Sequence, residues 1–544
     1  MDRRQFLKVG AGALAVGALE LKTGGRALAG ALDAPSSFSS APSAPSAPFT
    51  LGVASGDPLP RGVVLWTRLA TDPFNGGGTG TRGVPVEWEV AADDRFRRVV
   101  QRGTALAGPE LGYSVHVDVQ GLRPATTYWY RFRAQREISP VGRTRTAPAA
   151  GSSPRSLNFA FASCQQWQTG YYTAYRHMAE QDLDLVVHLG DYIYEGIHAT
   201  TARSQLAPEL AWPEPTDLSS YRNRYALYKL DPDLQAAHAA FPFVVTWDDH
   251  EVENNYASDI SQIDTEPDQD REVFRQRRAA AYKAWYEHMP VRASLQPAGP
   301  DLLLYRRLRF GDLADFNVLD TRQYRSDQAC GGARGAPCEE LGDPTRTITG
   351  MEQEQWLLDG LDSSRSRWKV LAQQVFVAKR DFAVGPTIDV NADAWDGYPF
   401  SRDRLLGFID ERDVRDVVVL TGDVHNSWVN DLKANFDDPS SATLATEFVG
   451  TSITSGGDGT DTPTPAAAAA LQENPHIKFF SNRRGFVQCS LTQRHWRTDF
   501  QEVPYVTRPG APLTTRASFL VESGRPGAEQ IAGAPVSIDA AVAG

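Results

Sequence analysis

Cysteine is scarce in this chain, with only four occurrences among 544 residues. So low a count excludes a small disulfide-dense scaffold as the basis of the fold. Cys489 lies in the apolar run FVQCSL and is expected to be a buried structural thiol. Cys330 and Cys338 flank the Gly-rich loop CGGARGAPC. They either close a small disulfide in an oxidising compartment or remain two free thiols on a mobile loop.

Long basic runs are also missing, and the formal net charge is −12. This argues against nucleic-acid binding, which depends on clustered Lys and Arg side chains against phosphates. The apolar stretch over roughly residues 9–21 is interrupted by Glu20 and is shorter than the ~20 apolar residues that span a bilayer. We expect no nucleic-acid-binding surface and no stable membrane anchor.

Residues 1–29 follow the order of an export signal. An Arg3-Arg4 pair in RRQFLK precedes the short apolar stretch, and Ala27-Leu28-Ala29 supplies a small-x-small cleavage site. The alternative is an amphipathic N-terminus that stays on the chain. We interpret the segment as a twin-arginine signal peptide, so the twin-arginine translocase is an expected partner. The predicted location is secreted or extracytoplasmic, in a periplasm or cell wall.

The next two segments differ in composition and in period. Residues 30–48 are mostly Ser, Ala and Pro, which is typical of a flexible linker. Residues 49–148 predict an all-β sandwich with strands in VVLWTRLA, VPVEWEVAAD, YSVHVDVQGL and TTYWYRFRAQ. The segment 122–130, LRPATTYWY, resembles the tyrosine corner of fibronectin type III-like domains. We expect this domain to support or cover the rest of the protein.

Strands alternate with helices after residue 154, which predicts a layered α/β domain over residues 155–500. Helices are expected over 169–181 and 268–288, with aromatic side chains of the core. The residues at helical spacing are Tyr172, Tyr175 and Met178 in the first helix, and Val273, Phe274, Tyr282, Trp285 and Met289 in the second. Residues 501–544 are expected to be a C-terminal extension with one apolar strand that packs on the protein.

Four apolar strands of the α/β domain run into side chains that ligate metals. In an open α/β sheet, ligands bind beyond the carboxyl ends of the strands. A thiolate combined with carboxylates and an imidazole fits metal ions better than it fits a structural core. The strands are LNFAFASCQ up to Cys164, DLVVHLGDYIYE through Asp191, FPFVVTWDDHE through Asp248 and Asp249, and DVVVLTGDVH through Asp423 and His425.

Two of these strands end in the same Gly-Asp phrase, at Asp191 and at Asp423. The repeat suggests two related βαβ halves that face each other across one site. Gly190 allows the tight turn that points the Asp191 carboxylate into the crevice. Tyr194 follows Asp191 by three residues, a spacing that one helical turn brings to the same side. A phenolate beside a carboxylate suits a hard trivalent ion such as Fe(III).

The densest polar cluster is WDDHEVENN, residues 247–255. The adjacent Asp248 and Asp249 repel each other unless cations or partners neutralise them. An exposed acidic loop is the alternative, but the preceding apolar strand would deliver the pair to a buried end. His250 could ligate a metal, contact the substrate oxyanion or protonate a leaving group. The i, i+2 spacing of Asp423 and His425 would let both reach neighbouring ions.

The motifs GDYIYE, WDDHEVENN and GDVHNS, with Cys164 upstream and a twin-arginine leader, resemble the PhoD family of alkaline phosphatases and phosphodiesterases. The layout is also similar to that of purple acid phosphatases, with three departures. Cys164 replaces an aspartate, Asp249 an asparagine and Asp423 a histidine, and these departures match the PhoD pattern. The resemblance implies a metallophosphatase-like β-sandwich flanked by helices, with one Fe(III) and calcium as cofactors.

The resemblance also implies roles for individual residues. Iron would be held by Cys164, Asp191, Tyr194 and His425. Asp191 would bridge to Ca²⁺, which Asp249, Asn254 and Asp423 would complete, with Asp248 as a further metal-ligand candidate. His250 and Asn254 would act as catalytic residues that steady the phosphoryl group. The implied reaction is hydrolysis of a phosphate mono- or diester by a hydroxide held on the metals.

Two alternatives to a general phosphatase remain at this point. The same site could belong to a phospholipase D-type or cell-wall-polymer phosphodiesterase, because selectivity depends on a pocket rim expected in the insertions at roughly 198–235 and 255–270. Outside enzymes, the chain could be a secreted fibronectin-like adhesin with an inactive core. The intact acidic cluster opposes the adhesin, since converging carboxylates without a metal would destabilise a fold.

Overall fold

The computed structural model describes residues 48–534 except for 75, 79, 197–202, 204, 206, 208, 209, 211, 263–266 and 333. The second of the two units of the chain, Ser43–Gly544, contains all of the described residues. The predicted signal peptide, the linker up to residue 47 and the last residues, 535–544, lie outside the described residues.

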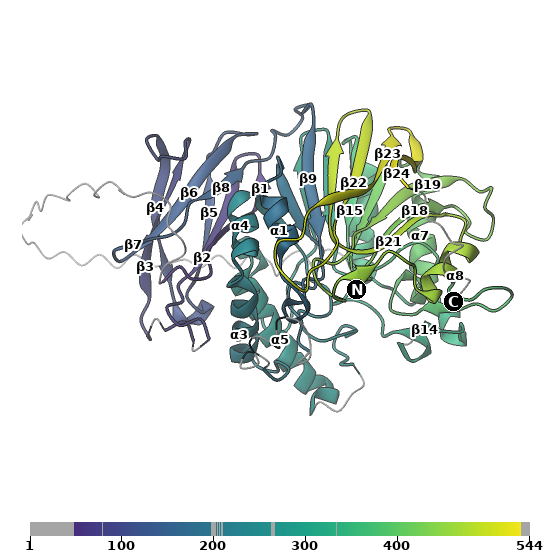
Figure 1. Cartoon of the computed structure of the whole chain (residues 1–544), viewed down its shortest axis with the longest axis horizontal. Helices are drawn as coiled ribbons and strands as arrows, with labels where there is room; N and C mark the ends of the chain where they lie inside the picture. The colour runs from purple at the N-terminus through teal and green to yellow at the C-terminus, as the bar shows by residue number, and fades with distance from the viewer. Residues whose placement is uncertain are drawn as a thin grey trace, which may run out of the picture. The chain divides into compact units, whose positions relative to one another are not determined.

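Two β-sheets form the centre of the α/β domain, and they share one strand (Figure 1). The first sheet has, in spatial order, β5 (Ser114–Gln120), β2 (Gly62–Arg68), β1 (Val53–Leu59), β11 (Pro242–Val245), β10 (Leu185–His188), β9 (Leu157–Ala162), β21 (Ile477–Leu491), β22 (His495–Val503), β23 (Thr514–Glu522) and β24 (Arg525–Gly533). The neighbours β9, β10 and β11 run parallel.

The second sheet lies on the other side of the shared strand β21. Its order is β12 (Arg306–Phe310), β13 (Ala314–Val318), β15 (Trp368–Ala372), β17 (Val417–Thr421), β19 (Thr443–Val449), β18 (Ser427–Lys433) and β21. A short strand, β20 (Gly459–Thr460), also pairs with β21.

Strand β21 pairs with β18 through Ser481 and then, from Arg484 onward, with β22, joined by β9 from Val487. Gly485 lies where the partners change. A Cβ atom there would come within 1.9 Å of the Gln501 carbonyl oxygen, so only glycine fits.

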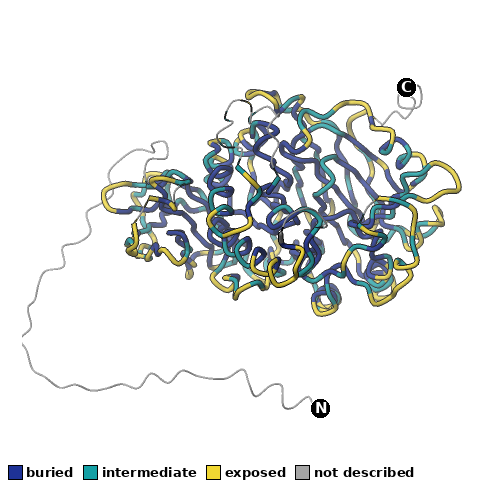
Figure 2. The backbone as a smooth tube through the Cα atoms, turned by 90° about the horizontal axis from the view of Figure 1, so that it is seen from below, coloured by how far each residue is buried: buried dark blue, intermediate teal, exposed yellow. Residues whose placement is uncertain are grey.

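The apolar strands are buried on both faces, as their uninterrupted hydrophobic runs predict. Val187 and Val418 point into the core between the two sheets, whereas their neighbours Val186 and Val417 point to the outer helical layers. This alternation follows from the two-residue period of a strand. Figure 2 shows the resulting continuous interior of buried backbone with exposed residues confined to the periphery.

Helices cover the outer face of each sheet. The first sheet packs against α1 (Thr173–Ala179), α3 (Leu218–Lys229), α4 (Pro232–Ala240) and α5 (Arg271–His288). The second sheet packs against α6 (Met351–Ser363), α7 (Pro399–Glu411) and α8 (Pro465–Glu473). The structure is therefore the layered α/β fold expected from the sequence, with helices outside two packed sheets.

The N-terminal part is all-β, as predicted. A separate sheet of β4 (Val99–Ala107), β3 (Val84–Ala91), β6 (Thr127–Ala134), β7 (Glu137–Ile138) and β8 (Gly142–Arg145) packs on β1, β2 and β5 through an apolar cluster. The backbone N–H of Arg123 donates to the Tyr128 hydroxyl at 3.0 Å, which is the hydrogen bond of a tyrosine corner. Because β1 pairs with β11, one layer of this sandwich continues into the sheet of the α/β domain. The domain boundaries themselves stay a prediction.

Several local expectations can be compared with the structure. The predicted helices form as α1 and α5, and their named aromatic residues are buried. Val273 is 44% exposed, because it precedes Phe274 and cannot share its buried helix face. The pocket rim expected over roughly 198–235 stays a prediction; within that stretch, α3 and α4 bury Tyr221, Tyr225 and Leu234 in the core.

The cysteines also fall into place. Cys330 and Cys338 form a disulfide, and Cys489 is a buried free thiol on β21. The C-terminal segment adds two strands, β23 and β24, to the edge of the first sheet. Among the described residues, no helix is long and apolar enough to cross a membrane.

Candidate metal centre

The strand ends that carry the predicted metal ligands lie close together in the structure. The parallel strands β9, β10 and β11 deliver Cys164, Asp191 and the pair Asp248-Asp249 to the same edge of the first sheet. Strand β17 delivers Asp423 and His425 from the second sheet. The two sheets are tied together at this edge, since the Cys164 carbonyl accepts hydrogen bonds from the backbone N–H groups of residues 454 and 455 at 3.4 and 3.3 Å.

The backbone is strained at these ligand positions. Cys164, Asp191, Asp423 and His425 have φ values of 58°, 56°, 65° and 59°, in the left-handed region that non-glycine residues seldom adopt. Such conformations cost on the order of 1–3 kcal/mol each and are concentrated at functional sites. Gly190 has a φ of 111°, and a Cβ atom there would lie 2.5 Å from the Asp248 nitrogen. The turn before Asp191 therefore requires glycine, as the sequence predicted.

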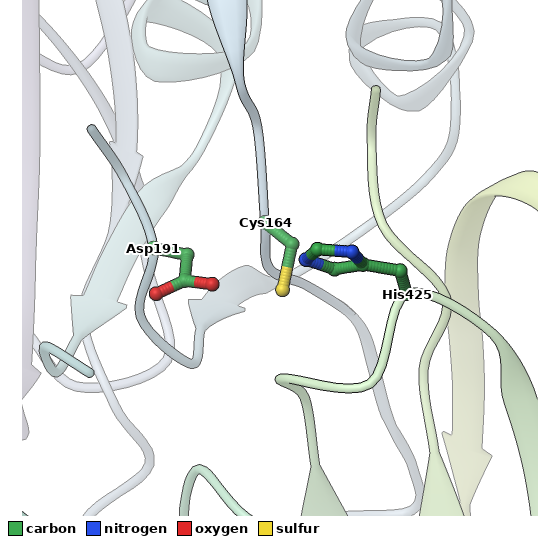
Figure 3. Close-up of side chains that lie close together, drawn as sticks. All are labelled: Cys164, Asp191 and His425. Atoms are coloured by element: carbon green, nitrogen blue, oxygen red, sulfur yellow. The ribbon is translucent and has the colours of Figure 1, made fainter. Parts of the chain in front are cut away.

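A first cluster joins three of the predicted iron ligands. Ligand atoms of Cys164, Asp191 and His425 all lie within 4.8 Å of one another (Figure 3). The Tyr194 hydroxyl donates to Asp191 Oδ2 at 2.8 Å and lies 2.9 Å from His425 Nε2. The four predicted iron ligands are thus neighbours. Asp191 Oδ1 is buried and has no hydrogen-bond partner.

A second cluster shares Asp191 with the first. Ligand atoms of Asp191, Asp249 and His250 also lie within 4.8 Å of one another. The position of Asp191 in both clusters fits a carboxylate that bridges two ions. Asp249 accepts the backbone N–H of His250 at 3.0 Å and of Asn255 at 2.7 Å, which fixes the orientation of its carboxylate.

His250 is oriented by a residue that the sequence reasoning did not single out. Its Nδ1 lies 2.6 Å from Glu195 Oε2, and Glu195 also accepts the backbone N–H of Asn254 at 2.8 Å. The His250 ring packs against the Tyr194 ring with centroids 4.1 Å apart. Since Nδ1 faces Glu195, Nε2 is left free for an ion or a substrate.

Arg322 occupies the space beside the acidic pair. Its Nε donates to Asp248 Oδ1 at 2.5 Å, and its Nη2 lies 3.4 Å from Asp249 and 3.9 Å from Asp423. Nη2 is buried without a hydrogen-bond partner. The repulsion expected between the two adjacent aspartates is therefore partly relieved by a guanidinium. One oxygen of Asp248 is committed to that guanidinium, whereas its Oδ2 is unpartnered.

Asn254 has one side-chain atom left for the site. Its Nδ2 donates to Gln262 and its backbone N–H to Glu195. A role for Asn254 as ligand or phosphoryl contact would thus fall to its Oδ1.

Burial shifts the pKa values of the proposed ligand groups. Burial raises the pKa of the Cys164 thiol, of the Tyr194 phenol and of the Asp191 carboxyl well above their ordinary values. Burial also raises the pKa of Asp423 to about 6, with Asp393 adding to the effect. Burial and the Arg484 charge lower the pKa of His425 to about 3, which keeps its imidazole neutral. All of these groups ligate metals as the anion or as the neutral imidazole, and a bound cation would favour those forms. The residues therefore fit a metal centre.

Two further side chains shape the centre. Arg484 is buried, and its guanidinium donates to the His425 carbonyl and to the Gly457 carbonyl, so it holds the loop that carries His425. Glu251 accepts the backbone N–H groups of Asp191 and Asp248, which locks two loops together. Glu251 lies inside the motif WDDHEVENN, whereas Arg484 lies far from the recognised motifs. The sequence therefore did not indicate a role for Arg484.

Two packed sheets with outer helices carry a buried set of thiol, phenol, carboxylates and imidazole at their carboxyl edge, a donor set that fits metal ions. Family models for the PhoD-like phosphatase and for the PhoD-like phosphatase N-terminal domain match residues 159–500 and 34–148. The chain belongs to the PhoD-like phosphatase family.

Individual relatives agree with this assignment. The chain is 51% identical over 531 residues to alkaline phosphatase D of Bacillus subtilis (strain 168), covering 97% of this chain and 89% of that protein. A solved structure described as the structure of PhoD superposes with a TM-score of 0.85 at 51% identity, covering 91% of this chain and 94% of that one. Purple acid phosphatase 15 of Arabidopsis thaliana is 27% identical over 142 residues, about a quarter of each chain.

Proposed function

We propose that this chain is an exported alkaline phosphatase or phosphodiesterase that works with Fe(III) and Ca²⁺. One observation carries the proposal: Cys164, Asp191, Tyr194 and His425 meet at one point, with an unpartnered buried oxygen on Asp191. Phenolate and thiolate ligands suit Fe(III), and the oxygen-rich set around Asp249 suits calcium. Asp191 would bridge the two ions.

The calcium side would be completed by Asp249, Asp423 and the Oδ1 atom of Asn254. Asp248 would contribute its unpartnered Oδ2 or serve to anchor Arg322. When bound, the ions would polarise the phosphoryl oxygens and acidify the attacking water.

Side chains beside the metals would donate a proton and contact the phosphoryl group. Burial opposes a charge on His250, but the carboxylates of Glu195, Asp191 and Asp249 raise its pKa well above the ordinary value. With Nδ1 held by Glu195, His250 would present an Nε2–H toward the phosphoryl group or the leaving oxygen. Glu195 would keep the ring in this orientation, and Asn254 would steady the phosphoryl group.

Export is the part of the proposal that depends mainly on the sequence. The Arg3-Arg4 pair and the Ala27-Leu28-Ala29 site support passage through the twin-arginine translocase. The Cys330–Cys338 disulfide supports an oxidising destination outside the cytoplasm.

Selectivity between esters separates the remaining alternatives. Family membership decides for an enzyme and against the adhesin. A phospholipase D-type or cell-wall-polymer phosphodiesterase would use the same ions with a different rim. Relative turnover of p-nitrophenyl phosphate and bis-p-nitrophenyl phosphate discriminates between monoester and diester chemistry.

The iron assignment predicts colour. Protein exported through its own route should contain iron and show a visible ligand-to-metal charge-transfer band from the Tyr194 phenolate and the Cys164 thiolate. Tyr194→Phe and Cys164→Ser should each lose or shift the band, while Cys489→Ser, a buried thiol on β21, should leave it unchanged. Elemental analysis with an absorption spectrum checks this. A colourless, iron-free and fully active enzyme would contradict the iron assignment.

The calcium assignment predicts sensitivity to chelators. EGTA treatment that removes calcium should lower turnover about tenfold or more, because Lewis-acid stabilisation of the transition state is worth several kcal/mol. Added Ca²⁺ should restore activity, since hard carboxylate ligands bind it reversibly. Calcium per chain is measured alongside turnover. Unchanged turnover in calcium-free enzyme would show that calcium has no catalytic role.

A further inference from the structure

Arg380 is a buried cation whose guanidinium has no ion-pair or hydrogen-bond partner among the described residues. Its exposed fraction is 4%, and its Nε has no hydrogen-bond partner. Within the described part of the chain, the guanidinium makes no ion pair and no hydrogen bond. The neighbouring Asp396 instead accepts the backbone N–H of Arg380 at 3.0 Å and the Arg402 guanidinium at 2.5 Å. An unpaired buried charge is costly, so its retention requires a reason.

Three aromatic rings hold the guanidinium in place. Its carbon lies 3.9 Å from the Phe376 ring centroid, 4.7 Å from that of Phe382 and 5.5 Å from that of Trp428. Contacts of this kind engage the guanidinium through the ring faces and compensate part of its lost hydration. They do not consume its N–H donors, whose planar fork matches a phosphate or carboxylate.

Arg380 is linked through an aromatic ring to the loop that carries His425. Trp428, one of its three rings, donates its indole N–H to Asn426, the neighbour of His425. Burial lowers the pKa of Arg380 to about 10, while the nearby charges of Asp396 and Asp423 raise it, so Arg380 is within electrostatic reach of a predicted metal ligand. Ligation of a cation by Asp423 would remove part of this compensation, while the charge of Asp396 would remain.

A second arginine, Arg334, contacts the Phe382 ring from a loop closed by a disulfide. Arg334 lies with its guanidinium carbon 4.8 Å from the Phe382 centroid, and it pairs with Asp389 at 3.2 Å. Its strand, β14 (Arg334–Gly335), pairs with β16 (Val390–Asn391) and lies inside the loop closed by the Cys330–Cys338 disulfide. About half of the Arg334 side chain is exposed, so it is available from solution.

We propose that Arg380, with Arg334 beside it, binds a second phosphate group of the substrate next to the metal centre. This inference rests on the hydrolase site proposed above and defines its substrate class further. The enzyme would prefer esters that carry two phosphates a few bonds apart, as bisphosphates do. One phosphate would occupy the metals, and the other would meet the free edge of the Arg380 guanidinium.

Alkanediol phosphates test this directly. For each chain length, kcat and KM are measured for the monophosphate, the bisphosphate and the ω-carboxyalkyl phosphate, with excess Ca²⁺. The wild-type enzyme should favour the bisphosphate at one or two chain lengths. Arg380→Met should lower kcat/KM for that bisphosphate about 10- to 100-fold, mainly through KM, because a charge-assisted contact is lost. Turnover of the monophosphate should stay within about threefold.

Controls separate binding from folding. Arg412→Met removes another arginine that stacks on an aromatic ring, that of Phe408. Arg412 is exposed and directly follows α7, so this variant should leave kcat/KM unchanged for both the monophosphate and the bisphosphate. If Arg380→Met does not fold, Arg380→Lys carries the test, since it keeps the charge and should retain part of the preference.

Three outcomes would overturn the subsite: a wild-type enzyme without preference for the bisphosphate, an equal loss for both esters in Arg380→Met or Arg380→Lys, or a carboxylate as good as the second phosphate. A wild-type enzyme loaded with metal that hydrolyses none of the esters would overturn the hydrolase function itself, and the subsite with it.

Discussion

Asp191→Asn is expected to remove metal and activity together. Asp191 takes part in both ligand clusters, and its Oδ1 has no other partner. An amide is a poor bridging ligand, and two cations on a weaker linker would repel each other. Loss of Lewis-acid catalysis by the metals should lower turnover by about 10³-fold or more. Iron and calcium per chain, measured with kcat, check this result.

The fold should survive that substitution, because Asn has nearly the shape of Asp and the Asp191 backbone N–H keeps its bond to Glu251. Asp184→Asn is the matched control. Asp184 lies at the other end of β10 and accepts the Asn158 backbone N–H at 2.9 Å, a bond that an amide oxygen can also accept. Full metal content in Asp191→Asn would show that Asp191 is not the bridge.

His250→Ala is expected to lower kcat about 10²- to 10⁴-fold, the range typical of general acid–base groups, while largely sparing bound metal. The reason is that Glu195 holds Nδ1, so the ring is placed to act on the phosphoryl group or the leaving oxygen. Glu195→Gln should lower kcat less, because the ring remains but its orienting charge is lost. Measuring metal content and kcat in both variants decides the role.

His177→Ala is the control, since His177 is a partly buried histidine on α1 that contacts the Ala511 carbonyl. The ligand atoms of His250 do lie within 4.8 Å of Asp191 and Asp249, so ligation is the direct competitor. If His250→Ala loses metal as fully as Asp191→Asn does, His250 is a ligand and its assignment as an acid–base group is wrong.

The strand ends could be predicted because they obey strong local rules. Continuous apolar runs such as VVVLT predict strands buried on both faces, and Gly followed by Asp predicts a turn that presents a carboxylate. These rules predicted that Cys164, Asp191 and Asp423 share one centre, and in the structure the ligand atoms of Cys164 and Asp191 lie within 4.8 Å of each other and of His425. The place of Asp423 in the centre stays a prediction. The family resemblance supplied what the local rules could not, namely which residue belongs to which ion.

Other features were missed for physical reasons. Strand β1 contains Gly56, Asp57 and Pro58, so its sequence lacks a strand pattern, yet its pairing with β11 joins the sandwich to the α/β domain. Arg322 follows β13, whose Asp315 and Asn317 interrupt the apolar run. Charged residues are seldom fully buried, so a buried arginine between four carboxylates is a tertiary feature that no local sequence pattern predicts.

The shared strand β21 has a mechanical consequence. The centre takes Cys164 and Asp191 from one sheet and Asp423 and His425 from the other, and one unbroken backbone of fifteen residues crosses both sheets. The sheets cannot slide apart without breaking β21 hydrogen bonds, so no hinge separates the two halves of the centre. The spacing between the side chains proposed to hold the ions is therefore set when the chain folds. Selectivity among substrates must then depend on the loops around the centre. These loops can change in evolution without disturbing the centre.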